Sequence, residues 1–232
     1  MSKVQIDTKA NRDRLFDKMR TTLGGAVDAA TRDQAVRKRL ERHGRNLVPE
    51  RSNLDAAGQL ELFRVQAEAV SATVVDVDSH ADVPEAITDY LRQHNLPARI
   101  KHGADKVLTA LPWDKTPALA RDHGPAHGDD AVSLSHAFAA VAETGTLILA
   151  SGPDNPTSLN FLPENHIVVL DASTLGGSYE DAWDSLRKTY GEGTLPRAVN
   201  MISGPSRTAD VEQTIQLGAH GPRRLHVIVV KG

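Results

Sequence analysis

Apolar residues in the first third of the chain recur at spacings that are typical of helices. One face of the first predicted helix is formed by Leu15, Phe16, Met19 and Leu23, and Gly24-Gly25 ends this pattern. The same periodicity predicts further helices at about 31–43 and 53–70. The third helix is expected to bury Leu60, Phe63, Ala67 and Val70. No Gly/Ser-rich linker follows, so we expect residues 1–70 to form a helical lead-in packed on the main domain.

From residue 71 to residue 232 short apolar runs alternate with helical patterns. Strands are predicted at 72–77, 98–100, 131–134, 146–150, 166–170, 198–202 and 226–230. Helices are predicted at about 83–94, 180–190 and 209–217, whereas 101–130 reads as irregular. Strands that alternate with helices of this length imply crossover units. The fold class expected for 71–232 is therefore α/β, Rossmann-like, with a mostly parallel sheet flanked by helices.

Two copies of Ser-Gly-Pro stand out, at 151–153 and at 203–205, and each follows a predicted strand. Gly permits close backbone approach, and the adjacent Pro ends strand pairing. If both strands belong to one parallel sheet, both turns lie at its carboxyl edge, where open α/β sheets bind ligands. The repeat therefore predicts one site built from two loops.

The second turn is rich in groups that bind anions. Four polar residues precede the predicted helix at 209–217: Ser203, Ser206, Arg207 and Thr208. Thr208 is the predicted N-cap of that helix. Backbone amides at that helix end, together with these side chains, could hold a carboxylate or a phosphate. The alternative is a well-capped turn in which Asp210 and Glu212 repel anions.

A carboxylate and two hydroxyls precede the first turn. Glu143, Thr144 and Thr146 surround Gly145, and Ser151 opens the turn itself. Glu143 could act as a base, a nucleophile or a partner for a ligand hydroxyl, or it could be a solvent-facing residue of a turn. The following loop carries Asn160 as a candidate ligand residue and ends at His166. His166 is either a ligand group or a half-buried histidine.

Composition narrows the function classes. The chain has 232 residues and 25.0 kDa, with 40% hydrophobic and 25% charged residues, as in soluble globular proteins. A net charge of -3 argues against a general nucleic-acid binder. With zero Cys, the chain has no disulfide, no thiolate nucleophile and no Cys-ligated iron–sulfur cluster of its own. No apolar stretch approaches the roughly 20 residues of a membrane span, and no signal peptide is evident, so a cytoplasmic location is expected.

Two other candidate sites carry weak signals. His123 and His127 are four residues apart, as metal ligands on a helix can be, but Gly124, Pro125 and Gly128 disfavour a helix there. No metal site is therefore expected. A basic run lies at 32–45, but it lacks interleaved aromatic residues, so a solvated helix face explains it better than nucleic-acid binding does.

Several motifs in order carry a family resemblance. They are Ala142-Glu143-Thr144-Gly145-Thr146-Leu147, the run from Asn160 to Val169, the run from Ile202 to Asp210, and Gly218-Ala219-His220-Gly221-Pro222 with the last strand. Over about residues 128–231 the chain resembles the lactate-utilisation protein C family, whose members contain a LUD domain and were formerly described as YkgG-like. The resemblance implies a NagB/RpiA/CoA-transferase-like fold for 71–232.

The same resemblance implies a pathway. The family acts in oxidation of L-lactate to pyruvate, alongside a Cys-rich protein and an iron–sulfur protein. Without Cys, this chain matches the cluster-free member, so no cofactor is expected in it and iron–sulfur clusters are expected on the partner subunit.

Two hypotheses follow for the chain's own role. In the first, a small carboxylate or phosphorylated ligand binds between the two turns. Arg207 would pair with the anion, Ser206 and Thr208 would donate hydrogen bonds, and Glu143 would face the reacting side. In the second, the chain is a non-catalytic assembly or regulatory subunit that contacts the iron–sulfur partner through the helical lead-in and the loop 101–130.

Overall fold

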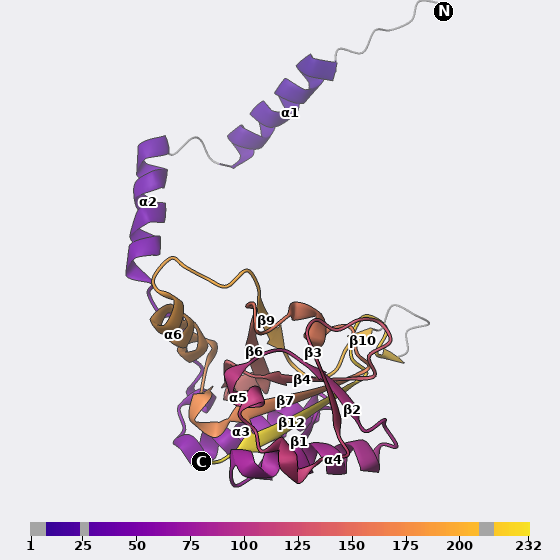
Figure 1. Ribbon diagram of the computed structural model, residues 1–232. Helices are drawn as coiled ribbons and strands as arrows, with labels where there is room; N and C mark the ends of the chain where they lie inside the picture. Colours follow the sequence, from indigo (N-terminus) through magenta and orange to yellow (C-terminus); the bar gives the residue numbers. More distant parts are fainter. Residues whose placement is uncertain (1–7, 24–27, 209–215) are drawn as a thin grey trace, which may run out of the picture. The chain divides into compact units, whose positions relative to one another are not determined.

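The computed structural model describes residues 8–23, 28–208 and 216–232 (Figure 1), which fall into two compact units, Met1–Arg45 and Asn46–Gly232. The first unit contains α1 (Thr8–Thr22) and α2 (Ala29–Arg42), as the periodicity predicted. Asp28 caps α2, because its carboxylate accepts hydrogen bonds from the amides of Ala30 and Thr31. Taken by itself, this unit leaves its apolar face uncovered: Phe16 is 44% exposed. Its packing on the main domain stays a prediction.

The second unit begins before the boundary that we expected at residue 70. Its third helix, α3 (Ala56–Ala69), starts at the capping carboxylate of Asp55 and buries Phe63 and Ala67, two of the four side chains predicted for its inner face. The structure therefore groups α3 with the main sheet.

The main sheet has six strands in the order β1-β12-β7-β4-β2-β3, and every neighbouring pair is parallel. The strands are β1 (Thr73–Val77), β2 (Arg99–His102), β3 (Ala120–His123), β4 (Val132–His136), β7 (Asn165–Asp171) and β12 (Arg224–Val230). Central strands that are buried on both faces read as continuous apolar runs, which is why β7 and β12 were predictable. The α/β class with a mostly parallel sheet is confirmed.

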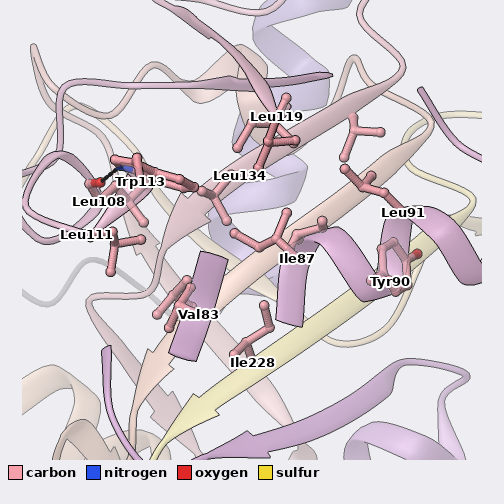
Figure 2. Close-up of a cluster of buried hydrophobic side chains, with 14 of the residues drawn as sticks. Val83, Ile87, Tyr90, Leu91, Leu108, Leu111, Trp113, Leu119, Leu134 and Ile228 are labelled. Atoms are coloured by element: carbon pink, nitrogen blue, oxygen red, sulfur yellow. Dashed lines mark hydrogen bonds between the residues drawn. The ribbon is translucent and has the colours of Figure 1, made fainter. Parts of the chain in front are cut away.

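Each face of the main sheet has its own core. On one face, α4 (Val83–Gln93) packs Val83, Ile87 and Leu91 toward the strands, as Figure 2 shows beside Ile228 of β12. Trp113 completes this cluster, and its indole Nε1 donates to the carbonyl of Leu108 over 2.9 Å (Figure 2). The other face packs against α3 and a second sheet.

The second sheet corrects the prediction of a single parallel sheet. Its order is β8-β5-β6-β9, with β8 (Leu175–Gly176), β5 (Ala139–Val141), β6 (Thr146–Ala150) and β9 (Val199–Ile202). The predicted strands at 146–150 and 198–202 therefore exist, but they pair with each other and run antiparallel. Helix α6 (Tyr179–Tyr190) covers the outer face of this sheet through Ala182 and Leu186.

Two other predictions need correction. The stretch 101–130 is not wholly irregular, since it contains α5 (Lys106–Thr109) and β3. Most of the predicted helix at 209–217, with Asp210 and Glu212, lies outside the described residues. Its last two residues form a strand, β11 (Gln216–Leu217), that pairs antiparallel with β10 (Arg207–Thr208). Thr208 therefore lies in a strand and pairs with Gln216.

Short 3-10 turns join these elements: η1 (Glu50–Ser52), η2 (His80–Asp82), η3 (Trp113–Lys115), η4 (Ala142–Thr144), η5 (Thr157–Asn160) and η6 (Ala172–Thr174). Within the described ranges, every helix is too short or too polar to cross a bilayer.

Candidate functional site

The two Ser-Gly-Pro turns lie at opposite ends of one antiparallel strand pair. In the β6–β9 register, Leu147 faces Ile202 and Ala150 faces Val199. Ser151 is consequently next to Ala198, whose amide donates to the Ser151 hydroxyl over 2.8 Å. Ser203 lies at the other end, beside Thr146. The structure therefore does not bring the turns together into one site.

The second turn lines a cavity of about 300 Å³, which we call the Ser203 pocket. Three segments form its wall: Asn160-Phe161, Met201–Arg207 and His220–Pro222, with His166 and Leu225 at the base. His166 and Leu225 stand near the amino ends of β7 and β12, so the pocket is at the amino edge of the main sheet. Four predicted ligand residues meet here: Asn160, Ser203, Ser206 and Arg207.

The second turn is docked onto the C-terminal end of α3. Gly204 has φ of +74°, and a Cβ there would lie 2.3 Å from the carbonyl oxygen of Val70. Arg207 Nη2 donates to that same carbonyl over 2.7 Å and to the Ser71 hydroxyl over 3.1 Å. A cation is favourable at a helix C-terminus. Arg207 thus anchors the turn as well as lining the pocket.

Ser206 joins the second turn to the segment before β12. Its amide donates to the carbonyl of Pro222 over 2.8 Å, and its carbonyl accepts from the amide of Gly218 over 2.9 Å. The amide of His220 donates to its hydroxyl over 3.3 Å. These hydrogen bonds fix the position of the second turn relative to residues 218–222, so two walls of the pocket are held together.

His166 forms the buried base of the pocket and is fully buried rather than half-buried. The Ser135 hydroxyl donates to Asn160 Oδ1 over 3.3 Å, so it accepts from His166 Nε2 over 2.9 Å. His166 Nδ1 then remains an acceptor, and it has no hydrogen-bond partner within the described part of the chain. Burial lowers the pKa of His166 to about 3, so the ring is neutral at physiological pH.

Three of the predicted ligand residues form a hydroxyl cluster with one that we missed. Thr146 Oγ1 is 2.7 Å from Thr144 Oγ1, 2.6 Å from Ser203 Oγ and 3.0 Å from the hydroxyl of Tyr179. The missed member, Tyr179, begins α6, far from the others in sequence. Because these hydroxyls satisfy one another, Thr144 and Thr146 brace the turn and do not line the pocket.

Glu143 lies outside the Ser203 pocket. Its side chain is only 7% exposed, with Oε2 3.8 Å from Arg51 Nη2 and Oε1 accepting from the amide of Tyr179 over 3.4 Å. Gly145 explains this position: it has φ of +62°, and a Cβ there would lie 2.4 Å from the amide nitrogen of Ala67. The turn carrying Glu143 is therefore pressed against α3. The predicted catalytic carboxylate does not face the other candidate residues.

A polar cluster that sequence reasoning missed lies at the carboxyl edge of the main sheet. His136 ends β4, with Nδ1 3.5 Å from Asp105 Oδ1 and Nε2 donating to Asp171 Oδ2 over 3.0 Å. Asp171 ends β7, and its Oδ1 is 2.8 Å from His80 Nε2. Strand order reverses between β2 and β4, which is where open α/β sheets place ligands. The signal was available only in part, because Asp171 is the one residue of this cluster that directly follows a predicted strand, 166–170.

The first Ser-Gly-Pro turn closes this carboxyl edge. A Cβ on Gly103 would lie 2.0 Å from the carbonyl oxygen of Asp154, and Asn155 Nδ2 donates to Asp105 Oδ2 over 3.3 Å. The cavity left beneath, beside His136, has a volume of about 10 Å³, which is room for about one water. The polar side chains therefore close this edge of the sheet. We call the group Asp105, His136, Asn155 and Asp171 the carboxyl-edge clamp.

The clamp is expected to make stability depend on pH. Burial disfavours the charged ring of His136, but Asp105 and Asp171 outweigh burial and raise its pKa. A raised pKa stabilises the fold below the unfolded value and loses that contribution as pH rises through the folded value. In a His136→Gln variant, the free energy of unfolding should fall by about 2 kcal/mol at pH 6 and by less at pH 9. Urea titrations at both pH values measure it; an equal loss at both would contradict the charge pairing.

His123 and His127, where no metal site was expected, do not lie on one helix. His123 ends β3 and its ring lies 4.1 Å from that of His102, whereas His127 lies in the following loop with Nδ1 3.9 Å from Asp130 Oδ2. Among the described residues, no three His, Asp or Glu side chains are arranged to hold a metal ion.

Comparison with known proteins bears on this arrangement. The model of the LUD domain matches residues 60–230. A lactate utilization protein C from Shouchella clausii is 37% identical over 99 residues, 43% of each chain, and one from an Exiguobacterium species is 25% identical over 180 residues, 74% of this chain and 77% of that one. The match to the first relative thus spans well under two thirds of its length.

A solved structure extends the likeness to the fold. The crystal structure of a DUF162 family protein from Deinococcus radiodurans superposes with a TM-score of 0.61 at 26% identity, covering 77% of this chain and 99% of that one. The sequence match reaches from α3 to β12, the elements that enclose the Ser203 pocket and the carboxyl-edge clamp. The chain belongs to the LUD domain family.

Proposed function

We propose that this chain is a ligand-binding component of a lactate-utilisation system and that its Ser203 pocket holds a small carboxylate. The observation that carries the proposal is the convergence of polar side chains from three separate segments, Asn160-Phe161, Met201–Arg207 and His220–Pro222, on one cavity of about 300 Å³. Such a volume is at the small end of ligand sites. The relatives named lactate utilization protein C support the choice of pathway.

The groups around the pocket suit an oxyanion. Ser203 and Ser206 supply hydroxyls, and the Arg207 guanidinium brings positive charge to the wall. The buried ring of His166 at the base is neutral, so it contributes no charge of either sign. A 2-hydroxy or 2-oxo carboxylate therefore meets hydroxyl donors and a cation, and the lining residues that the structure describes include no carboxylate.

The buried base of the pocket is suited to binding rather than to acid–base catalysis. Within the part of the chain that the structure describes, the titratable side chains that line the pocket are His166, Arg207 and His220. A His166 pKa of about 3 makes that ring a poor base and an unavailable acid near pH 7. Glu143 is held elsewhere by Arg51 and Tyr179. We therefore place electron transfer on the proposed iron–sulfur and Cys-rich partners, since this chain has no Cys.

Calorimetry tests the ligand proposal. L-lactate, pyruvate and inorganic phosphate are titrated into the full chain and into Ser206→Ala and Arg207→Ala variants. We expect one carboxylate to bind, with its Kd raised about tenfold or more in each variant because a hydrogen bond to a charged ligand is lost. Arg197→Ala is the matched control, as Arg197 lies beside the first turn and should leave Kd unchanged. Absence of binding by all three anions would contradict the proposal.

A second candidate, an assembly or regulatory subunit, is favoured by one observation. The hydroxyls of Thr144, Thr146 and Tyr179 bond to one another and to Ser203, as in a structural brace. Lactate oxidation by the partner proteins is measured with and without this chain. If Ser206→Ala and Glu143→Gln variants restore full turnover while binding no carboxylate, the assembly role is correct and the ligand role is not.

A further inference from the structure

Charge is divided unevenly along the chain. Residues 1–45 hold 12 Lys and Arg against six Asp and Glu, a net charge of +6, whereas residues 46–232 hold 15 against 24, a net charge of -9. Opposite charges on two surfaces steer their association and set their register. The basic segment precedes the LUD domain match, which begins at residue 60.

The acidic unit carries a groove that lies outside the sites described above. It has a volume of about 310 Å³ and runs between α4 and β1, the edge strand of the main sheet. Val75 and Val77 contribute apolar side chains, and Asp82, Glu85 and Asp89 contribute carboxylates. Arg92 already pairs with Asp89 over 2.8 Å, but that pair is exposed and therefore weak. We call this feature the acidic groove.

Helix α1 has the complementary character. Taken within its own unit, Leu15, Phe16 and Met19 are 57%, 44% and 50% exposed, and they share one face by helical spacing. Arg12 lies on that face, with its guanidinium 5.8 Å from the centre of the Phe16 ring. Arg20 flanks it and pairs with Asp17 over 2.6 Å, but that pair is exposed and therefore weak. An apolar stripe bordered by arginines fits a groove with apolar walls bordered by carboxylates.

We propose that the acidic groove receives helix α1 of a second copy of this chain. Phe16 and Met19 enter between α4 and β1, and Arg12 and Arg20 meet Glu85 and Asp89. Each copy offers both the helix and the groove, and the proposed assembly is a two-fold dimer with two identical contacts. The inference is independent of the function proposed for the Ser203 pocket.

Molar mass in solution tests the proposal. Light scattering on the full chain, over a concentration series at low and high salt, should show twice the 25.0 kDa of one chain at low salt, with dissociation as salt rises. A Glu85→Lys/Asp89→Lys variant should raise the dimer Kd at least about tenfold, since like charges then face each other. Combining it with Arg12→Glu/Arg20→Glu should restore the dimer.

The control reverses the same number of charges elsewhere. Glu61 and Glu192 are exposed residues outside the groove, and a Glu61→Lys/Glu192→Lys variant should dimerise as the wild type does. A Phe16→Ser/Met19→Ser variant tests the apolar part and should also weaken the dimer. A wild-type chain that stays monomeric at every concentration, or a charge swap that fails to restore the dimer, would overturn the proposal.

Discussion

A Gly204→Ala variant is expected to lose about 2–5 kcal/mol of unfolding free energy and, with it, the carboxylate binding that we propose for the Ser203 pocket. Two effects add. A non-Gly residue is strained at φ of +74°, and the new methyl group would lie 2.3 Å from the carbonyl oxygen of Val70, which is a backbone atom at the end of α3. The turn must lift from α3, and the Arg207 bonds to Val70 and Ser71 are then lost. Urea unfolding and calorimetry measure the two consequences.

The chain supplies a matched control in the other copy of the same tripeptide. A Cβ on Gly152 would meet no atom within 4 Å, and Gly152 is not among the residues with positive φ. Gly152→Ala should therefore change stability by no more than about 0.5 kcal/mol. Equal effects at Gly152 and Gly204 would show that the docking on α3 is not what requires glycine.

The sequence predicted where strands form better than it predicted which strands pair with each other. Runs such as 166–170 and 226–230 predict buried strands because both faces are apolar, and the structure has strands there. The runs at 146–150 and 198–202 carry the same local signal, yet they form a separate antiparallel pair. Strand direction depends on which element a strand packs against, and an apolar run does not encode its partner. The placement of both turns at one edge was therefore wrong.

The positions of the candidate site residues were likewise predictable only in part. The clustering of Asn160, Ser203, Ser206 and Arg207 follows from polar residues at strand ends, which are visible in the sequence. The position of Glu143 does not follow, because it depends on the close approach of Gly145 to α3 and on Arg51, which is distant in the chain. His136 was missed because the predicted strand stopped at 134, whereas β4 continues to His136 itself.

Acid should destabilise this protein through its buried histidines, and His226 offers the clearest test. Its side chain is 7% exposed, stacks on Tyr90 with ring centroids 4.2 Å apart, and its Nδ1 is 2.8 Å from Thr73 Oγ1. Burial, together with the nearby His94, lowers the pKa of His226 to about 4. Between pH 6.5 and pH 4 the unfolded chain therefore binds a proton at this residue that the folded chain does not bind.

Stability must then fall as the pH falls. For a pKa that is 6.5 when unfolded and about 4 when folded, the loss between pH 7.5 and pH 4 is about 3 kcal/mol. A His226→Gln variant removes this proton uptake, so its unfolding free energy should decline over that range by about 3 kcal/mol less than that of the wild type. Urea titrations at a series of pH values measure the two curves.

The direction of the pKa shift distinguishes His226 from His136 of the carboxyl-edge clamp. His136 has a raised pKa and adds stability on the acid side, so replacing it steepens the decline of stability toward acid, whereas replacing His226 flattens it. His127→Gln, which changes a histidine whose side chain is 70% exposed, is the control. If the His226→Gln and wild-type curves stay parallel from pH 7.5 to pH 4, the buried ring of His226 is not what makes the fold sensitive to acid.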